Sequence, residues 1–171
     1  MRTRFLALAT MLTALSAGSF TYASAGTVGP CFSGTTASTA SYKMGLHIGK
    51  QENMYLPSEV KARHLKTGEI MLGGEMAMVS PTTGTRVYHL EVHICTKSGS
   101  VVTRLNPVIV VDDTAGITSM QVPAAKMVGI GAASSDYHYG NDVALKPGSR
   151  VTVKVTVKAQ LAAFHATVPS R

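Results

Sequence analysis

The sequence predicts an all-β fold, an antiparallel β-sandwich, on three observations. From residue 44 onward, short extended runs are separated by turn signals at fairly regular spacing. No window of the chain favours a long amphipathic helix. The run 150–158 alternates valine with threonine or lysine, so one face is apolar and the other is polar. These patterns favour two sheets packed through their apolar faces.

The first residues have the features of a secretory signal peptide. Arg2 and Arg4 precede an apolar stretch over 5–15, and Ala23-Ser24-Ala25 offers a small-residue cleavage site. We therefore expect residues 1–25 to be removed and the protein to be periplasmic or secreted.

The remaining chain predicts a short leader followed by one domain. Residues 26–41 are almost entirely Gly, Ser, Thr and Ala without periodicity, which predicts a flexible leader. Residues 42–171 have the length of a single β-sandwich domain. The stretch 59–66 could add one or two helical turns. The predicted strands are 42–48, 70–79, 86–96, 108–112, 117–122 and 150–158.

Charge and motif content make several functions poor candidates. The net charge is +7, but the basic residues are scattered, without a dense block or interleaved aromatic residues, so we expect no nucleic-acid partner. The chain has no nucleophile elbow, Walker loop, HExxH or C-x-x-C motif. We therefore expect a binding protein rather than an enzyme.

The two cysteines allow one intramolecular disulfide, between Cys31 and Cys95. Pairing is the usual fate of two cysteines in an exported domain. Cys95 also continues the series of positions 89, 91 and 93, so in a regular strand it shares their face. A free thiolate there would favour Cu(I). Both interpretations stay open at this point.

The run His89-Leu90-Glu91-Val92-His93-Ile94 carries the clearest chemical signal. Side chains at alternate positions of a strand share one face, so His89, Glu91 and His93 point one way and the apolar residues the other. Imidazole and carboxylate are ligands for copper, zinc and iron. The alternative is an amphipathic strand with a solvated polar face.

A second cluster, Asp136-Tyr137-His138-Tyr139-Gly140-Asn141-Asp142, combines an imidazole with aromatic residues and a Gly-Asn pair. A metal ligand needs surrounding hydrogen-bonding groups that orient it, and a loop of this composition could supply them. The alternative is a tyrosine-rich turn that packs on one end of the sandwich.

The signal peptide, the H-L-E strand, the H-Y-G-N loop with its following apolar strand and the valine-rich late strand together resemble the periplasmic iron-transport family. The resemblance covers roughly residues 88–165. It implies an immunoglobulin-like sandwich, usually a homodimer, that binds copper and/or iron and works beside a membrane iron permease. By the same resemblance His89, Glu91 and His138 are metal ligands, and His165 could match a late histidine of the family.

The chain departs from the family pattern where a Met-Pro-Met segment is expected before the H-Y-G loop. Here Met127 is the nearest candidate, with a longer spacer before His138. Met127, His93 or His165 would complete the metal shell. Met71, Met76 and Met78 form a further thioether reserve, although methionine on a strand usually fills the core.

Two classes of function follow from the sequence. The first is an exported metal carrier that assists iron or copper uptake through His89, Glu91 and His138. The second is a metal-free structural or adhesive sandwich whose His/Glu face is solvated. A periplasmic copper chaperone is close to the first. His47 and His64 lie outside the family-like region, and we expect them not to bind metal.

Overall fold

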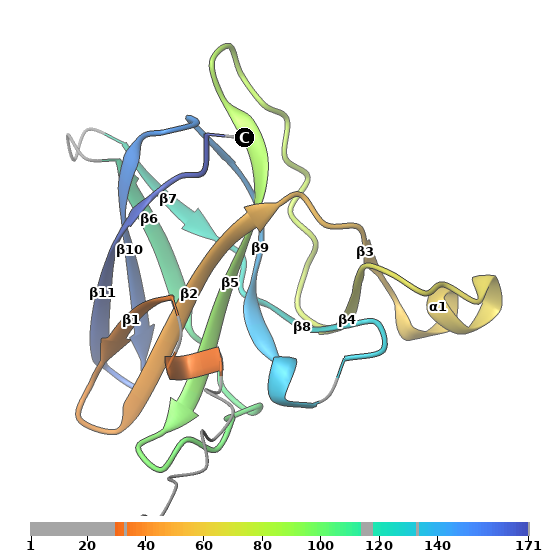
Figure 1. Cartoon of the computed structure of the whole chain (residues 1–171), viewed down its shortest axis with the longest axis horizontal. Coiled ribbons are helices and arrows are strands. Elements are labelled where there is room, and N and C mark those ends of the chain that lie inside the picture. The colour runs from red at the N-terminus through yellow and green to blue at the C-terminus, as the bar shows by residue number, and fades with distance from the viewer. Residues whose placement is uncertain (1–29, 33, 114–117, 133, 171) are drawn as a thin grey trace, which may run out of the picture.

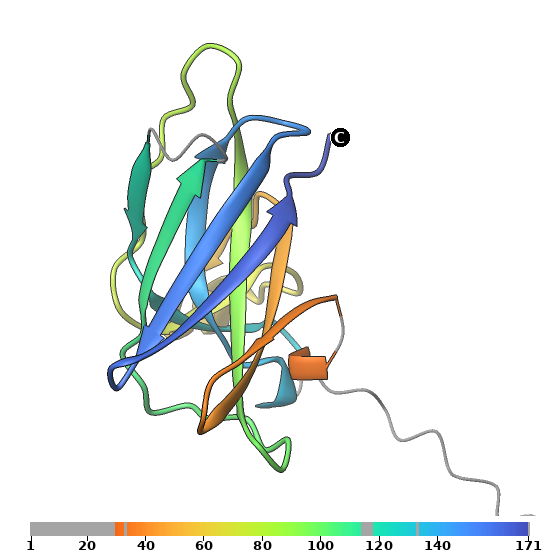
Figure 2. The same cartoon turned by 90° about the vertical axis from the view of Figure 1, so that its left-hand side faces the viewer.

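The computed structural model describes residues 30–32, 34–113, 118–132 and 134–170, and two packed β-sheets form its body. The larger sheet has the strand order β1-β2-β5-β9-β8-β4-β3, and the smaller has the order β11-β10-β6-β7. Figure 2 shows the smaller sheet in front of the larger one. The strands are β1 (Thr35–Ser38), β2 (Tyr42–Lys50), β3 (Met54–Tyr55), β4 (Glu69–Gly73), β5 (Arg86–Thr96), β6 (Val108–Asp113), β7 (Ser119–Val122), β8 (Ala125–Gly129), β9 (His138–Leu145), β10 (Arg150–Val157) and β11 (Gln160–Thr167).

The predicted all-β sandwich is confirmed. Strand pairs are antiparallel among the described residues, except for the parallel pair β3–β4. The core lies between the sheets, where Leu90 and Val92 of β5 and Val153 and Val155 of β10 are fully buried. Burying each such side chain contributes about 1.5–3 kcal/mol, so these alternating apolar faces hold the sheets together.

Helix α1 (Pro57–Arg63) occupies part of the stretch for which one or two helical turns remained open. Pro57 stands at the first helical turn, where its missing N–H costs nothing, and Glu59 accepts the Leu56 N–H at the N-terminus. His64 adopts the left-handed conformation and ends the helix. Figure 1 shows α1 projecting from the β3–β4 end of the larger sheet. No helix among the described residues is long and apolar enough to span a bilayer.

The strand predicted over 70–79 is wrong in its second half. Strand β4 ends at Gly73, after an irregularity in its pairing with β8, and Gly74 has a φ of +95°, which glycine adopts far more readily than other residues. The chain then leaves the sheet, and Met78 is 94% exposed. Met76 and Met78 therefore do not share a strand face.

The flexible leader predicted over 26–41 is also wrong for its described part. Residues 30–32 form a short 3₁₀ turn, and β1 pairs with β2. Cys31 is bonded to Cys95 at the end of β5, which confirms the predicted disulfide. The signal peptide over 1–25 and residues 26–29 lie outside the described residues.

Candidate metal centre

The face of β5 that carries His89, Glu91 and His93 points away from the inter-sheet core, as the alternation predicts. It is not solvated, however. His89 is 0% exposed and His93 is 6% exposed. In Figure 1 the smaller sheet lies on one side of β5 and β9, and β8, β4 and β3, which continue the larger sheet beyond β9, lie on the other. The polar face of β5 is therefore enclosed, and the premise of a solvated His/Glu face is wrong.

Strand β9 adds His138 to this face. The sequence predicts a loop over the cluster 136–142, but His138 is the first residue of β9 and is 0% exposed. Because Val92 pairs with Tyr139 and the strands are antiparallel, His138 lies beside His93. The ring centroids of His138 and His93 are 5.4 Å apart, and those of His138 and His89 are 5.7 Å apart. Two strands thus gather three imidazoles.

Each of the three imidazoles is oriented through its Nδ1 atom. His89 Nδ1 donates to the Asp142 carboxylate at 2.9 Å, and Asp142 is its direct partner across β5 and β9. His93 Nδ1 donates to the Tyr137 carbonyl at 3.2 Å, and His138 Nδ1 donates to the Asp136 carbonyl at 2.8 Å. A proton on Nδ1 leaves the lone pair on Nε2, as in histidines that ligate metals.

The Nε2 atoms lack ordinary partners. His89 Nε2 and His138 Nε2 are buried without a hydrogen bond, and so is Glu69 Oε2, which lies 3.8 Å from His138 Nε2. His93 Nε2 lies 3.5 Å from Glu91 Oε2. Buried polar atoms are nearly always satisfied, so these three unpartnered atoms call for a further partner, a water or an ion.

Two overlapping donor sets could hold an ion. Ligand atoms of Glu91, His93 and His138 all lie within 4.8 Å of one another, and so do those of Glu69, Asp136 and His138. Because His138 belongs to both sets, they form one cluster rather than two independent sites; this cluster, with His89 beside it, is called the histidine chamber below. The imidazole and carboxylate donors fit a borderline divalent transition metal.

Electrostatics in the chamber follow burial and the close opposite charges. Burial raises the pKa of Glu69 to about 7 and lowers the pKa of His138. Burial opposes the charged form of His89, yet the Asp142 hydrogen bond and the carboxylates around it raise its pKa overall. Burial likewise opposes ionisation of Glu91, but the adjacent His93 side chain and the charges of His138, His47 and His89 lower its pKa.

Two methionine side chains lie next to the imidazoles. Met127 of β8 is the register partner of His138 and is fully buried, and Met71 of β4 is the partner of Met127. Met127 packs with Met54 and Ala125 in a small apolar cluster, against which Met71 also lies. Met127 therefore serves as packing beside the chamber and also as a candidate soft ligand.

The structure brings five of the six predicted site residues together. Four of them, His89, Glu91, His93 and His138, converge, and Met127 adjoins them. His165 does not join them, because it lies on β11 of the smaller sheet, exposed and bonded to Thr152. Cys95 is held in the disulfide and offers no thiolate.

Sequence reasoning missed Glu69, whereas Asp136 and Asp142 belong to the cluster that was expected to orient a metal ligand, although neither was singled out within it. Asp142 could have been found from the spacing of His138 and Asp142, which share a face once 138–145 is a strand. Glu69 gives no local signal, because it reaches the chamber through the β4–β8 pairing. His47, expected to be remote, is the register partner of Glu91.

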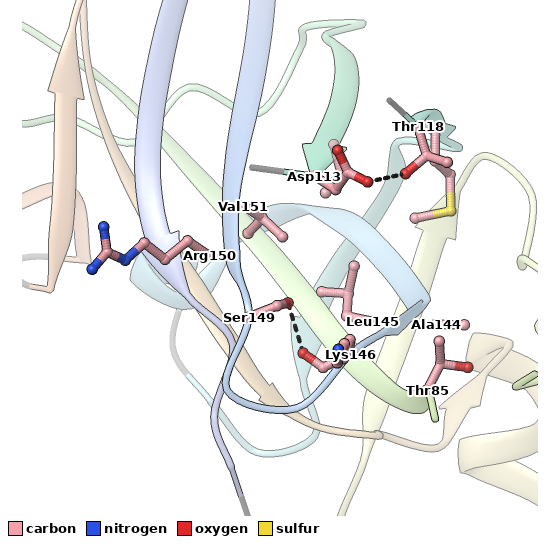
Figure 3. Close-up of a pocket in the computed structure, with 11 residues that line it drawn as sticks. Thr85, Asp113, Thr118, Ala144, Leu145, Lys146, Ser149, Arg150 and Val151 are labelled. Carbon is pink, nitrogen blue, oxygen red and sulfur yellow. Dashed lines mark hydrogen bonds between the residues drawn. The ribbon is translucent and has the colours of Figure 1, made fainter. Parts of the chain in front are cut away.

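A separate cleft of about 480 Å³ opens at the end of the sandwich near the β9–β10 turn. Figure 3 shows two hydrogen bonds among its lining residues: Thr118 Oγ1 donates to Asp113, and Ser149 Oγ donates to the Lys146 carbonyl. It has no imidazole among its lining residues. Its chemistry is therefore unrelated to that of the histidine chamber.

Comparisons with protein-family models, with curated proteins and with solved structures gave no match to this chain. The fold and the geometry of the histidine chamber are therefore the basis for the function proposed below.

Proposed function

We propose that this chain is an exported, non-enzymatic carrier that holds a divalent transition metal, copper or iron, in the histidine chamber. His89, His93 and His138 supply imidazole nitrogens, Glu91 and Glu69 supply carboxylate oxygens, and Met127 supplies a thioether. The resemblance to the periplasmic iron-transport family supports the finer part of the proposal. On that basis the protein is an immunoglobulin-like homodimer that assists iron or copper uptake and passes the ion to a membrane iron permease.

One observation carries the metal-binding proposal. Three buried imidazoles each have Nδ1 engaged by an acceptor, the rings of His89 and His93 both contact that of His138, and the Nε2 atoms of His89 and His138 are unpartnered. An unsatisfied buried polar atom costs about 1–3 kcal/mol. A bound ion would offset that cost, because each lone pair would gain a ligand bond.

The alternatives fit this chamber less well. A metal-free structural or adhesive sandwich has no use for buried, unpartnered Nε2 atoms. A periplasmic copper chaperone shares the chamber and would use Met127 and Met71 as soft ligands. The free Cys95 thiol that would have favoured a copper chaperone is absent, because Cys95 is in the disulfide.

Calorimetry of the metal-stripped protein with Cu(II), Zn(II) and Fe(II) tests the proposal. We expect saturable binding near one ion per chain, tightest for Cu(II), since nitrogen and oxygen sites follow that order whatever their cargo in the cell. Electron paramagnetic resonance of the Cu(II) form should show coupling to imidazole nitrogens. Absence of saturable heat with all three ions would overturn the proposal.

A further inference from the structure

The outward face of β2 lies directly beside the ligand face of β5. In the antiparallel register Gly45 pairs with His93, His47 pairs with Glu91 and Gly49 pairs with His89. The β2 face next to the three predicted β5 ligands therefore has one functional side chain, His47, between two glycines.

Exposure decreases from His47 inward. His47 is exposed, the Glu91 side chain is 19% exposed, the His93 side chain is 8% exposed and the His138 side chain is 1% exposed. Glu91 Oε2 is 3.5 Å from His93 Nε2. Glu91 is thus flanked by the exposed His47, its register partner on β2, and by the buried His93, two residues further along β5.

The His47 ring occupies the space that Gly49 leaves free. A Cβ atom added at Gly49 would lie 2.9 Å from His47 Nε2 and 3.2 Å from His47 Cδ2. The imidazole therefore lies along β2 above Gly49, whose register partner is His89. In this conformation a ligand nitrogen is held at the rim of the chamber.

We propose that His47 is the loading ligand of the chamber: an incoming hydrated divalent metal ion is captured by His47 and Glu91 and then transferred to His93, His138 and His89. This inference rests on the proposed metal-binding function. Each transfer is a ligand exchange in which an imidazole or carboxylate replaces a water or the preceding ligand, with no change of oxidation state. In the final state His47 no longer ligates the ion, and Glu91 remains with the buried imidazoles.

The experiment is stopped-flow loading of the metal-stripped full chain with Cu(II), followed through the absorbance of the bound ion, and extraction of the loaded ion by a chelator. His47→Ala should slow both loading and extraction about tenfold, within the range over which association rates vary among variants of one site. The dissociation constant should stay within about twofold of the wild-type value. A residue that assists only the transfer of the ion changes the loading rate and the extraction rate by the same factor. His165→Ala, an exposed histidine on the other sheet, is the matched control and should behave as wild type.

A second variant tests the role of His47 while the histidine is kept. Gly49→Ala places a methyl group against the His47 ring and displaces it. We expect loading to slow in the same direction as in His47→Ala, with circular dichroism unchanged.

The outcomes separate the two proposals. If the wild type shows no Cu(II) signal, the metal-binding function fails and the loading role fails with it. If the wild type binds but His47→Ala loads at the rate of His165→Ala, only the loading role is wrong. If His47→Ala loses equilibrium affinity as strongly as His138→Ala, His47 is a resident ligand and the loading role is again wrong.

Discussion

His138 is the residue on which the chamber depends most. It belongs to both donor sets, its ring lies between those of His89 and His93, and its Nδ1 is fixed by a backbone carbonyl rather than by a side chain. A backbone acceptor cannot rotate away, so the direction of Nε2 is set by the start of β9 itself. Loss of this imidazole would remove a candidate ligand from both donor sets.

His89→Ala and His138→Ala should each weaken Cu(II) binding by more than the roughly ten- to hundredfold loss typical of an outer-shell partner. Both variants should stay folded, because neither side chain belongs to the inter-sheet core. Calorimetry measures the affinity, and circular dichroism checks the fold.

His165→Ala serves as the control and should bind normally. His47 is unsuitable as a remote control, given its pairing with Glu91. If His165→Ala lost binding while the other two kept it, the ligand assignment would be wrong.

Glu69 makes the metal-free protein sensitive to pH. Its pKa in the folded state is about 7 against an ordinary value of 4.5, so the folded state favours the protonated form. Folding is therefore less favourable when Glu69 is ionised. The free energy of unfolding falls as pH rises from 4.5 through about 7, and the full cost applies above that range. This shift corresponds to about 3 kcal/mol.

Glu69→Gln should accordingly stabilise the metal-free protein at pH 8 by up to about 3 kcal/mol and change its stability little at pH 4. Urea denaturation in the presence of a chelator, at both pH values, measures the difference. The same variant should gain less stability than the wild type on addition of Cu(II), because it lacks a carboxylate ligand. An equal effect of the substitution at both pH values would contradict the role assigned to burial.

The local sequence predicts some of the residues that line the chamber and gives no indication of the others. Period-two spacing was enough to place His89, Glu91 and His93 on one face, and the family resemblance pointed to His138 and Met127. Glu69 joins through strand pairing over a long sequence separation, which leaves no local trace. His165 lies outside the chamber for the same reason. Its position in the sequence does not indicate which of the two sheets its strand joins.

Strand β9 shows why residues that are typical of turns led to a wrong prediction of a loop. Tyr139-Gly140-Asn141 has the composition of a loop, yet burial between β5 and β8 makes it a strand. Asn141 donates to the carbonyls of Glu75 and Pro123 and accepts the Ala77 N–H. Asn141 therefore fixes the irregular segment after β4 to the sheet instead of forming a turn.

Gly140 is required for the β5–β9 pairing. A Cβ atom at this position would overlap the carbonyl oxygen of Leu90, and the nearest atoms are backbone atoms that cannot rotate away. Gly140→Ala should destabilise the protein by at least about 3 kcal/mol, as expected when overpacking displaces backbone. Urea denaturation measures the loss.

Gly131→Ala is a useful comparison, since that position has a positive φ but open space around a Cβ atom. Its cost should be limited to backbone strain, about 1 kcal/mol. Equal losses in the two variants would mean that the close approach at Leu90 is not what Gly140 accommodates.

For the whole molecule, the disulfide ties the N-terminal segment to the larger sheet. Cys31 and Cys95 close a loop with a sequence separation of 64, which corresponds to about 4 kcal/mol in the chain-entropy account. Denatured but unreduced protein should contain no titratable thiol. Reduction should lower the free energy of unfolding by about that amount.

The variant with both Cys31 and Cys95 replaced by Ser should keep the stoichiometry of Cu(II) binding, although it unfolds more easily. Loss of the copper site in that variant, with the fold intact by circular dichroism, would contradict the assignment of both cysteines to the disulfide.

The order in which the chamber's donors occur along the chain determines when the site can form during folding. Glu69 enters on β4, the His89–His93 run on β5, and His138 only on β9, after the β6–β7 hairpin of the opposite sheet has been synthesised. In the unfolded chain, only His89, Glu91 and His93 are close enough in sequence to bind the same ion. Unlike a zinc finger, in which nearby ligands let the metal drive folding, this sandwich must first complete slow, long-range strand pairing. Under the proposed function, tight metallation would thus be a late event that reports on correct assembly of the larger sheet.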